Sequence, residues 1–382
     1  MQLRVLQQLS ELSPSQWSQL QLTGNPFLNP VFLTALEHTS VVGGDTGWQP
    51  CHLLLEDAQG IAALMPTYVK YHSYGEYVFD WVWAEAYESQ HLEYYPKLVS
   101  AIPYTPSEGS RVLLRIDYSF EQVLPHFLAG IQQLVRQYKL SSWHLLFPDQ
   151  HSYQQGLKQN LLGRTSCQYH WQNTEGWQDF EQFLNSFSAK KRKNVRQERR
   201  KIVDQGIKLR RVRGAEISQS QLRHFYQCYQ TTYQQRGRQG YLNMDFFQYL
   251  VEQMPEKIML VEAYIKDELE QNCSIAAALF FYDQSRLYGR YWGSRADVDC
   301  LHFEVCYYQG IEFCLEQGLT HFDPGTQGEH KVARGFSPYL THSNHWIAEP
   351  LFSQTIQQWL KSEQQQIEAY AQAIDLKTPF RK

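Results

Sequence analysis

The chain has 382 residues, enough for two domains of ordinary size, and 43% of them are hydrophobic, which favours packed cores and excludes wholesale disorder. Its 35 lysines and arginines face 39 aspartates and glutamates, and the net charge of −4 excludes a generally basic nucleic-acid coat. The composition also excludes collagen-like, coiled-coil and disulfide-scaffold proteins.

The first half predicts helices that alternate with strands. Ser13-Pro14 and Asn29-Pro30 are typical helix starts, with proline at the first helical position. Apolar residues at helical spacing predict a helix over 120–138, and a shorter helical stretch begins near Tyr87. Enrichment in β-branched and aromatic residues predicts strands at 50–56, 60–70, 76–82 and 143–147.

The second half continues this alternation, so we expect an α/β fold with mixed central sheets flanked by helices. Its strongest helix is predicted over Leu301–Glu316 and ends at Gly318, a typical C-terminal stop. A short strand should contain Phe322. The other predicted helices are 177–204, 218–235, 243–253 and 351–382, and the other predicted strands are 257–265, 273–282 and 285–292.

Short sequence matches relate the two halves at a nearly constant offset. The matching pairs are Ile61–Leu64 with Ile275–Ala278, Tyr74–Tyr77 with Tyr288–Tyr291, and Tyr94–Tyr95 with Tyr307–Tyr308. They predict an ancient duplication, and the alternative is two α/β domains that share turn chemistry by chance. We expect domains at 1–165 and 166–350, followed by a C-terminal helix over 351–382.

The cysteines and the apolar stretches indicate a cellular compartment. Seven cysteines are scattered without a C-x-x-C pair, which is typical of a reduced, cytosolic protein. The N-terminus lacks the apolar core of a signal peptide, and no apolar run approaches the length of about 20 residues that a membrane helix needs. His302 and Cys306 lie one helical turn apart, but no second pair completes a zinc site, so no metal is expected.

The most distinctive segment is 322–336, which holds three glycines among charged residues. Glycines let the backbone approach a ligand and expose N–H donors. Glu329 and His330 are group types used in general acid–base catalysis, and Lys331 and Arg334 can bind phosphate or carboxylate. We favour a functional loop over an ordinary loop with a local ion pair.

Three further residues are candidates for a site. Glu304 lies near the start of the helix predicted over Leu301–Glu316, where the helix dipole favours a carboxylate. It is either a functional group or a residue that only stabilises the start of the helix. Arg290 lies among aromatic residues beside Gly289, which indicates a bulge or a close approach. Asp80 is predicted on the apolar face of a strand, where a buried carboxylate needs a raised pKa or a specific partner. It is either a structural acid or a functional one.

A basic run occupies 190–201, where eight of the twelve residues are lysine or arginine. It also looks helical, which indicates a folded basic face that binds phosphate, in tRNA or in a nucleotide-linked substrate. A solvated helix face is the alternative. The residues expected to bind the donor are Lys190, Lys191, Arg192, Lys193 and Arg196.

The chain resembles a bacterial family of predicted N-acyltransferases, the FemAB-like or peptidoglycan biosynthesis/recognition family, which is placed near the GNAT superfamily. The resemblance spans residues 25–350. It rests on the stretches 25–27, 73–77 with 79–81, 190–194 with 196, 288–293, 301–304 and 325–331.

This resemblance implies two tandem GNAT-like domains of the Fem type and transfer of an acyl or aminoacyl group to an amine acceptor, such as a cell-wall precursor. GNAT enzymes hold coenzyme A through a Gln/Arg-x-x-Gly-x-Gly/Ala turn, to which Arg236–Gly240 is the nearest stretch. Fem enzymes use aminoacyl-tRNA instead, and the basic run at 190–201 suits that acidic donor. The donor therefore stays open between acyl-CoA and aminoacyl-tRNA.

Catalysis in such an enzyme would be mostly positional, with an oxyanion met by backbone N–H groups. We expect Glu304 or Glu329 as the base, with His330 and Asp80 as further candidates. The residues expected to bind substrate are Lys331, Arg334, Arg290, Trp292, Gln327, Tyr74, Glu76, Trp83 and His302. The alternative is a non-catalytic module that recognises a peptidoglycan precursor or RNA.

Overall fold

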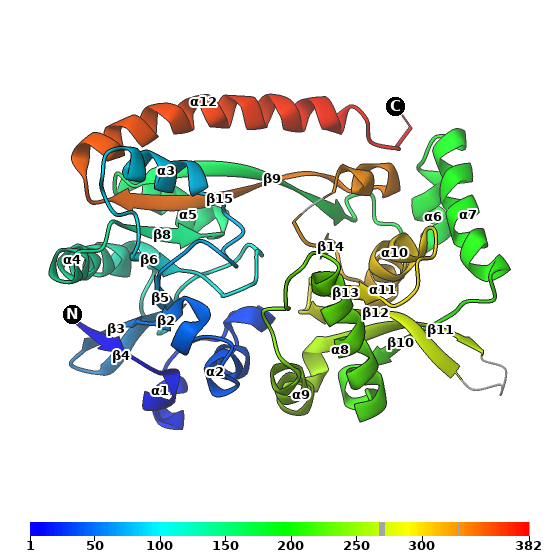
Figure 1. The fold of residues 1–382 in the computed structure, drawn as a ribbon, viewed down its shortest axis with the longest axis horizontal. Coiled ribbons are helices and arrows are strands. Elements are labelled where there is room, and N and C mark those ends of the chain that lie inside the picture. Colours follow the sequence, from blue (N-terminus) through cyan, green and yellow to red (C-terminus); the bar gives the residue numbers. More distant parts are fainter. Residues whose placement is uncertain (267–271, 327, 382) are drawn as a thin grey trace. The chain divides into compact units, whose positions relative to one another are not determined.

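The computed structural model describes residues 1–266, 272–326 and 328–381, and the chain divides into two compact units (Figure 1). Unit 1 comprises Met1–Cys167 and Leu340–Ala369, and unit 2 comprises Gln168–Tyr339 and Tyr370–Lys382. The chain passes from one unit to the other within strand β9 (Leu162–Gln172), strand β15 (Ser337–Ile347) and helix α12 (Pro350–Asp375). Leu340–Ala369 groups with the N-terminal segment because β15 pairs with a strand of unit 1 over Ser343–Ile347.

Unit 1 contains two groups of paired strands. The first consists of β1 (Gln2–Leu6), β3 (His52–Asp57), β4 (Gly60–Met65) and β7 (Leu113–Leu114), all antiparallel. The second consists of β2 (Trp48–Pro50), β5 (Thr67–Lys70), β6 (Lys97–Ser100), β8 (Ser142–Leu146) and the end of β15, in which only the β6–β8 pair is parallel. The single strand predicted at 60–70 is therefore two strands. Pro66 separates them because proline has no N–H to donate to a sheet.

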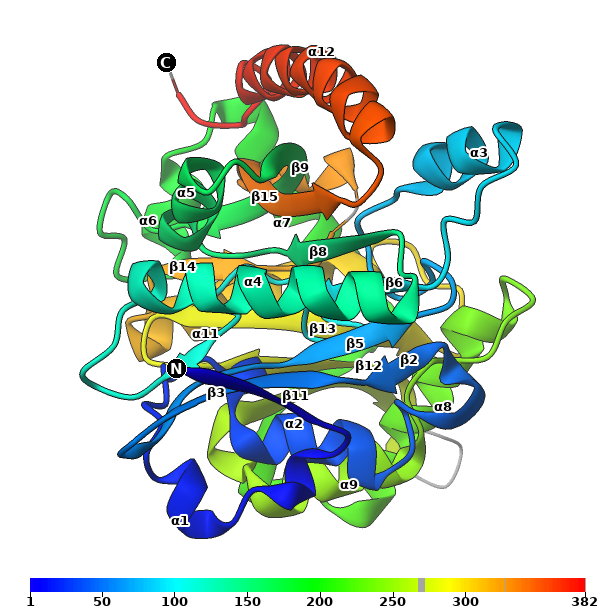
Figure 2. The same ribbon diagram turned by 90° about the vertical axis from the view of Figure 1, so that its left-hand side faces the viewer.

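Helix α4 (Phe120–Tyr138) is the main helix of unit 1 and confirms the predicted helix over 120–138. Its apolar face, with Val123, Phe127 and Ile131 fully buried, packs on residues of β3, β4, β6 and β8, and Figure 2 shows it running alongside β8. The other helices are α1 (Pro14–Trp17), α2 (Pro30–His38), α3 (Trp81–Ser89) and α5 (Gln150–Lys158), with 3-10 turns at Leu9–Glu11, Pro26–Leu28 and Gly44–Thr46.

The strand predicted at 76–82 is wrong. Gly75 and Tyr77 have φ values of +81° and +60°, which interrupt an extended backbone. Asp80 is instead the residue that precedes helix α3, and Val82 is 58% exposed rather than packed on an apolar sheet face. The aromatic and β-branched residues next to Asp80 in the sequence therefore belong to a loop and to the first turn of α3, and not to a strand.

Unit 2 is built around six hydrogen-bonded strands that form both parallel and antiparallel pairs. Its strands are β10 (Lys208–Arg213), β11 (Ile258–Lys266), β12 (Asn272–Tyr282), β13 (Arg286–Ser294), β14 (His321–Asp323) and the end of β9, of which only β13 and β14 pair in parallel. The predicted strands at 257–265, 273–282 and 285–292 are confirmed, whereas β10 and β9 were not predicted.

The helices of unit 2 include the predicted basic helix. They are α6 (Phe180–Asn185), α7 (Ala189–Asp204), α8 (Gln219–Gln234), α9 (Met244–Gln253), α10 (Leu301–Phe303) and α11 (Gln309–Gln317), with 3-10 turns η4 (Gly214–Glu216), η5 (Pro255–Lys257) and η7 (Glu329–Arg334). The helix predicted over 177–204 is two helices, since Ser188 has extended backbone angles (φ −58°, ψ 150°). A π-helical segment, Glu304–Tyr308, interrupts the helix predicted over Leu301–Glu316, and Gly318 ends it as expected.

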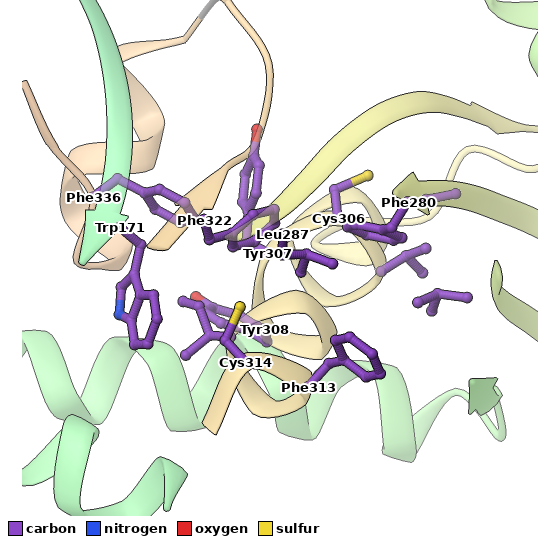
Figure 3. Packing of buried hydrophobic residues seen from close by; sticks show 14 of the residues in the cluster. Trp171, Phe280, Leu287, Cys306, Tyr307, Tyr308, Phe313, Cys314, Phe322 and Phe336 are labelled. Atoms are coloured by element: carbon purple, nitrogen blue, oxygen red, sulfur yellow. The ribbon is translucent and has the colours of Figure 1, made fainter. Parts of the chain in front are cut away.

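The core of unit 2 is rich in aromatic residues (Figure 3). Tyr307 of the π-helical segment lies 5.3 Å from Phe336, and Phe336 lies 5.5 Å from Phe322, measured between ring centroids. Helix α11 approaches this layer closely, because a Cβ on Gly310 would lie 2.5 Å from the ring of Phe322. The core thus fixes the π-helical segment against β14, which leads directly into the glycine-rich loop.

The α/β fold with mixed sheets flanked by helices is confirmed. Of the three sequence matches between the halves, Ile61–Leu64 and Ile275–Ala278 both lie in strands. Tyr74–Tyr77 lies in a loop and Tyr288–Tyr291 in β13, so this match does not join equivalent elements, and the duplication stays a prediction. Within the described residues, no helix has the length and apolar character needed to cross a membrane.

Candidate functional site

The glycine-rich loop positions His330 through its backbone. Gly325, Gly328 and Gly335 have φ values of +93°, +109° and +90°, and the last two bracket the 3-10 turn η7. A Cβ on Gly328 would lie 2.2 Å from the imidazole of His330, so glycine is required there both for backbone angle and for space. The predicted substrate ligand Gln327 lies outside the described residues.

His330 has the features of a general base. The ring is exposed on one side, and its Nε2 lies 2.8 Å from the hydroxyl of Tyr307. Partial burial, together with the nearby charges of Lys331 and Arg334, lowers the pKa of His330, so the imidazole is neutral at pH 7. In the tautomer whose Nε2–H donates to Tyr307, the lone pair on Nδ1 is free to accept a proton.

Lys331 is a buried amine beside this imidazole. Its side chain is 2% exposed, and Nζ donates a hydrogen bond to the carbonyl of Gly325. Burial lowers the pKa of Lys331 to about 7, although the carboxylate of Asp323 opposes that shift. A negatively charged ligand at this position would therefore draw a proton onto Lys331 and gain an ion pair in a low-dielectric site.

Arg334 is bound on three sides rather than free to hold a ligand. Its Nε and Nη2 donate to the carboxylate of Glu198 in α7 at 3.1 and 2.6 Å, and its Nη1 donates to the carbonyl of His330 at 2.6 Å. The guanidinium carbon lies 3.3 Å from the ring centroid of Phe303. Arg334 thus joins the basic helix to the glycine-rich loop.

Arg290 occupies a bulge of β13, as Gly289 predicted. The register with β12 skips Arg290 between Gly289 and Tyr291, and its buried guanidinium forms a two-pronged ion pair with Asp323. Burial alone would raise the pKa of the Asp323 carboxyl, but Arg290 and His170 hold it well below its usual range. Asp323 also accepts the N–H of Gly325 at 3.0 Å and so fixes the start of the loop. The sequence did not single it out.

Two predicted substrate ligands lie close to the loop. The rings of Trp292 and His302 are 5.2 Å apart, and the rings of His302 and His330 are 5.8 Å apart. Burial lowers the pKa of His302 to about 3, so it is neutral. Lys331, Arg334, Arg290, Trp292 and His302 are thus gathered around His330 and the loop.

Of the two carboxylates expected as the base, neither has the environment of His330. Glu304 is buried, and Arg199 donates to its two oxygens at 3.1 and 3.0 Å while Gln309 donates at 2.9 Å. Burial raises the pKa of Glu304, and the ion pair with Arg199 opposes this. Glu329 is exposed and accepts a hydrogen bond from the hydroxyl of Tyr370.

Helix α7 presents two different faces. Val195 and Ile202 are buried, and Glu198 and Arg199 point to the π-helical segment and the loop. On the exposed side, Arg196 pairs with Glu181 at 2.7 Å and Arg192 contacts Asn185 at 3.4 Å. The lysines expected to bind the donor, Lys190, Lys191 and Lys193, form no ion pair with the described residues.

Unit 1 holds a separate buried polar cluster around Lys97, a residue that the sequence analysis did not single out. The ammonium of Lys97 contacts the carboxylates of Glu76, at 2.8 Å, and Asp80. Ser73 donates to Asp80 at 2.5 Å, and Tyr94 donates to its other oxygen. Asp80 therefore has the specific partner that its burial requires. A lysine inside the apolar run that forms β6 was the signal available in the sequence.

The charges of this cluster are coupled. Burial raises the pKa of Glu76 to about 7, against the pull of Lys97. Burial would also raise the pKa of Asp80, but Lys97 and the hydrogen bonds from Ser73 and Tyr94 outweigh it and lower the pKa. Burial alone would lower the pKa of Lys97, but the neighbouring carboxylates of Asp80 and Glu76 outweigh burial and raise it. The cluster therefore resembles a structural ion pair more than a free catalytic acid.

The other two predicted residues of unit 1 are Tyr74 and Trp83. The carbonyl of Tyr74 accepts a hydrogen bond from Lys70 at 3.1 Å, and its ring is largely exposed. Trp83 is buried, 4.9 Å from the ring of His345 and 5.3 Å from the guanidinium carbon of Arg164. Over the described part of the chain, no group of three or more His, Cys, Asp or Glu residues could hold a metal ion.

Comparisons with known proteins place the chain in a family. No curated protein sequence matches it. Similar solved structures include FemX (13% identity, 85% of this chain and 92% of that chain, TM-score 0.47) and L-PGS from Bacillus licheniformis (12% identity, 85% and 95%, TM-score 0.48). Another is a tandem GNAT protein from the clavulanic acid biosynthesis pathway (7% identity, 91% and 99%, TM-score 0.45). The profile of the FemAB-like family, described as peptidoglycan biosynthesis/recognition, matches residues 8–382, and the chain therefore belongs to the FemAB-like family.

Proposed function

We propose that this protein is an N-acyltransferase or aminoacyltransferase that acylates an amine on a cell-wall precursor. The family description supports the precursor as acceptor. The observation that carries the chemistry is His330, a neutral imidazole with one nitrogen bound by Tyr307 and the other free, beside the buried amine of Lys331.

These residues suit acyl transfer to an amine. The acceptor reaches the site as an ammonium group and gives a proton to Nδ1 of His330. The free amine then attacks the carbonyl carbon of the donor ester or thioester, and an N–C bond forms as the carbonyl oxygen becomes an oxyanion. Protonated Lys331 would stabilise that oxyanion. When the C–O or C–S bond breaks, the leaving group takes the proton held by His330, and the nitrogen of the new amide releases its second proton to solvent.

The basic helix supports a donor that carries phosphate. Lys190, Lys191 and Lys193 are unpaired among the described residues, and both acyl-CoA and aminoacyl-tRNA are rich in phosphate. A polyanion such as tRNA would engage several of them at once. Its affinity would then fall steeply with salt, whereas acyl-CoA offers fewer contacts.

The donor is tested by direct binding at several salt concentrations. We would compare aminoacyl-tRNA and acetyl-CoA on the wild type and on the triple variant Lys190→Gln, Lys191→Gln, Lys193→Gln. The matched control is Arg136→Gln, Lys158→Gln, Lys361→Gln, three exposed cations of unit 1. If tRNA is the donor, the triple variant lowers the slope of log affinity against log salt by about 2–3, and the control does not. Equal slopes for both variants would contradict the role given to α7.

A further inference from the structure

Unit 2 contains a pocket that none of the described site candidates lines. Its volume is about 560 Å³, within the usual range for small-molecule sites. It lies between the end of β9, the end of α6, the residues that follow η7, and the C-terminal tail. Its walls include Trp177, Phe380, Glu175, Arg381, Asn185 and His170.

The C-terminal tail forms one wall of this pocket and is fastened in place. Phe380 pairs with Phe187 in a β-bridge, and the N–H of Arg381 donates to the carbonyl of Ser186 at 2.9 Å. The ring of Phe380 lies nearly parallel to that of Trp177, with centroids 5.9 Å apart. Two aromatic rings and a fixed backbone therefore make a preformed apolar wall.

Two opposite charges line the same pocket without neutralising each other. Glu175 and Arg381 form no ion pair with each other or with other described residues. The Nε of Arg381 donates to the carbonyl of Phe187 at 3.2 Å, which orients the guanidinium and leaves its two terminal nitrogens for a ligand. A second guanidinium, that of Arg192, lies 3.4 Å from the amide oxygen of Asn185, which lines the pocket.

We propose that this pocket binds a zwitterion with an apolar side chain, either a free α-amino acid or a dipeptide whose ammonium and carboxylate groups are both free. The carboxylate would bind the planar guanidinium of Arg381, which matches it in two-pronged geometry. The ammonium group would bind Glu175, and the side chain would lie against Trp177 and Phe380. A ligand of one charge would leave either Glu175 or Arg381 without a partner.

The position of the pocket links its occupant to the glycine-rich loop and to the basic helix. Ser186 comes shortly before α7, and Gly335 directly ends η7. His170 stacks on Tyr339 and lies 3.7 Å from Asp323, the partner of Arg290. The occupant would thus touch the chain at the ends of both elements. The proposal itself does not depend on the proposed function, since binding can be measured without turnover.

The test is calorimetric titration of the full-length protein with L-phenylalanine and its analogues. 3-Phenylpropionate lacks the ammonium group and phenethylamine lacks the carboxylate, and we expect each to bind at least about tenfold more weakly. The dipeptides Ala-Phe and Phe-Ala assign the source. Tighter binding of either dipeptide than of phenylalanine indicates a dipeptide as the ligand, and the reverse indicates a free amino acid.

Variants connect this binding to the pocket. Arg381→Gln should weaken the binding of phenylalanine about tenfold or more. Glu175→Gln should abolish the preference of the pocket for phenylalanine over 3-phenylpropionate. Arg136→Gln and Glu85→Gln, exposed residues of unit 1, serve as charge-matched controls. Absence of binding by phenylalanine and both dipeptides overturns the proposal. So does equal binding of the three phenylalanine analogues to the wild type, a comparison that needs no variant to fold.

Discussion

Arg334 in the glycine-rich loop and Glu198 in the basic helix α7 form a two-pronged ion pair at 3.1 and 2.6 Å. Tyr308 of the π-helical segment donates to the same carboxylate. One acidic residue inside a basic run thus fixes the position of α7 against the loop that carries His330. The neighbouring residue of α7, Arg199, donates to both carboxylate oxygens of Glu304 and so fixes α7 against the π-helical segment.

The first prediction concerns this contact. Glu198→Gln should lower the free energy of unfolding by about 1.5–3 kcal/mol, because the mostly buried guanidinium of Arg334 loses its charged acceptor. Glu181→Gln removes the exposed partner of Arg196, which also lies on α7. This variant should lower the free energy of unfolding by at most about 1 kcal/mol. Urea unfolding of both variants checks this. Equal losses would show that the Arg334 contact contributes no more than a surface ion pair.

The second prediction concerns Lys97. Lys97→Met should lower the free energy of unfolding by about 3–5 kcal/mol, because it leaves Asp80 and Glu76 buried without their cation. The loss should shrink as pH falls and these carboxyls take up protons. Lys158→Met, at an exposed position, is the control. A loss that stays constant with pH would contradict the charge explanation.

The third prediction concerns Lys331. Its folded pKa, about 7, lies below the ordinary value of 10.5, so the folded protein binds fewer protons and loses stability as pH falls from about 10.5 to 7. Lys331→Met removes this cost. We expect it to be more stable than the wild type by on the order of 1–2 kcal/mol at pH 7, and by less at pH 9.5. A variant that is less stable at pH 7 would show that the amine is not strained by its burial.

The fourth prediction concerns acid unfolding. Arg290 holds the pKa of Asp323 below its ordinary value, so its contribution to stability is full above the unfolded pKa, about 3.9, and is lost as pH falls further. Asp323→Asn removes a charged partner of buried Arg290 and should be less stable at pH 7. Its free energy of unfolding should then change less than that of the wild type below pH 4. Parallel pH profiles for the two proteins would count against this assignment.

Local signals in the sequence predicted much of the fold. Helix α4 follows from apolar spacing, and the end of α11 follows from Gly318. The loop before α3 was mistaken for a strand, because strands and buried loops use the same aromatic residues and the deciding feature is the positive φ of Gly75 and Tyr77. Glycine permits such an angle at Gly75 without requiring it, and the residue type of Tyr77 gives no sign of it.

The candidate site could be predicted only in its composition. The sequence pointed to the loop and to His330, but the ion pairs that surround them join residues far apart in the chain. Arg199 meets Glu304, and Arg290 meets Asp323, only after the sheet and the π-helical segment have packed. From the sequence alone, Glu304 and Glu329 were the first candidates for the base, and His330 was a further one. The structure leaves His330 as the group with a free nitrogen.

The central claim is that this protein transfers an acyl group to an amine with His330 as the base. The direct measurement is mass spectrometry of a UDP-linked muropeptide after incubation with aminoacyl-tRNA or acetyl-CoA. We expect the acceptor amine to gain the acyl group of one donor, at a rate that His330→Gln lowers about 100-fold or more and Glu329→Gln leaves largely unchanged. A precursor that binds tightly but never gains an acyl group from either donor would contradict the claim and identify a binding module, and a full rate with His330→Gln would exclude this base.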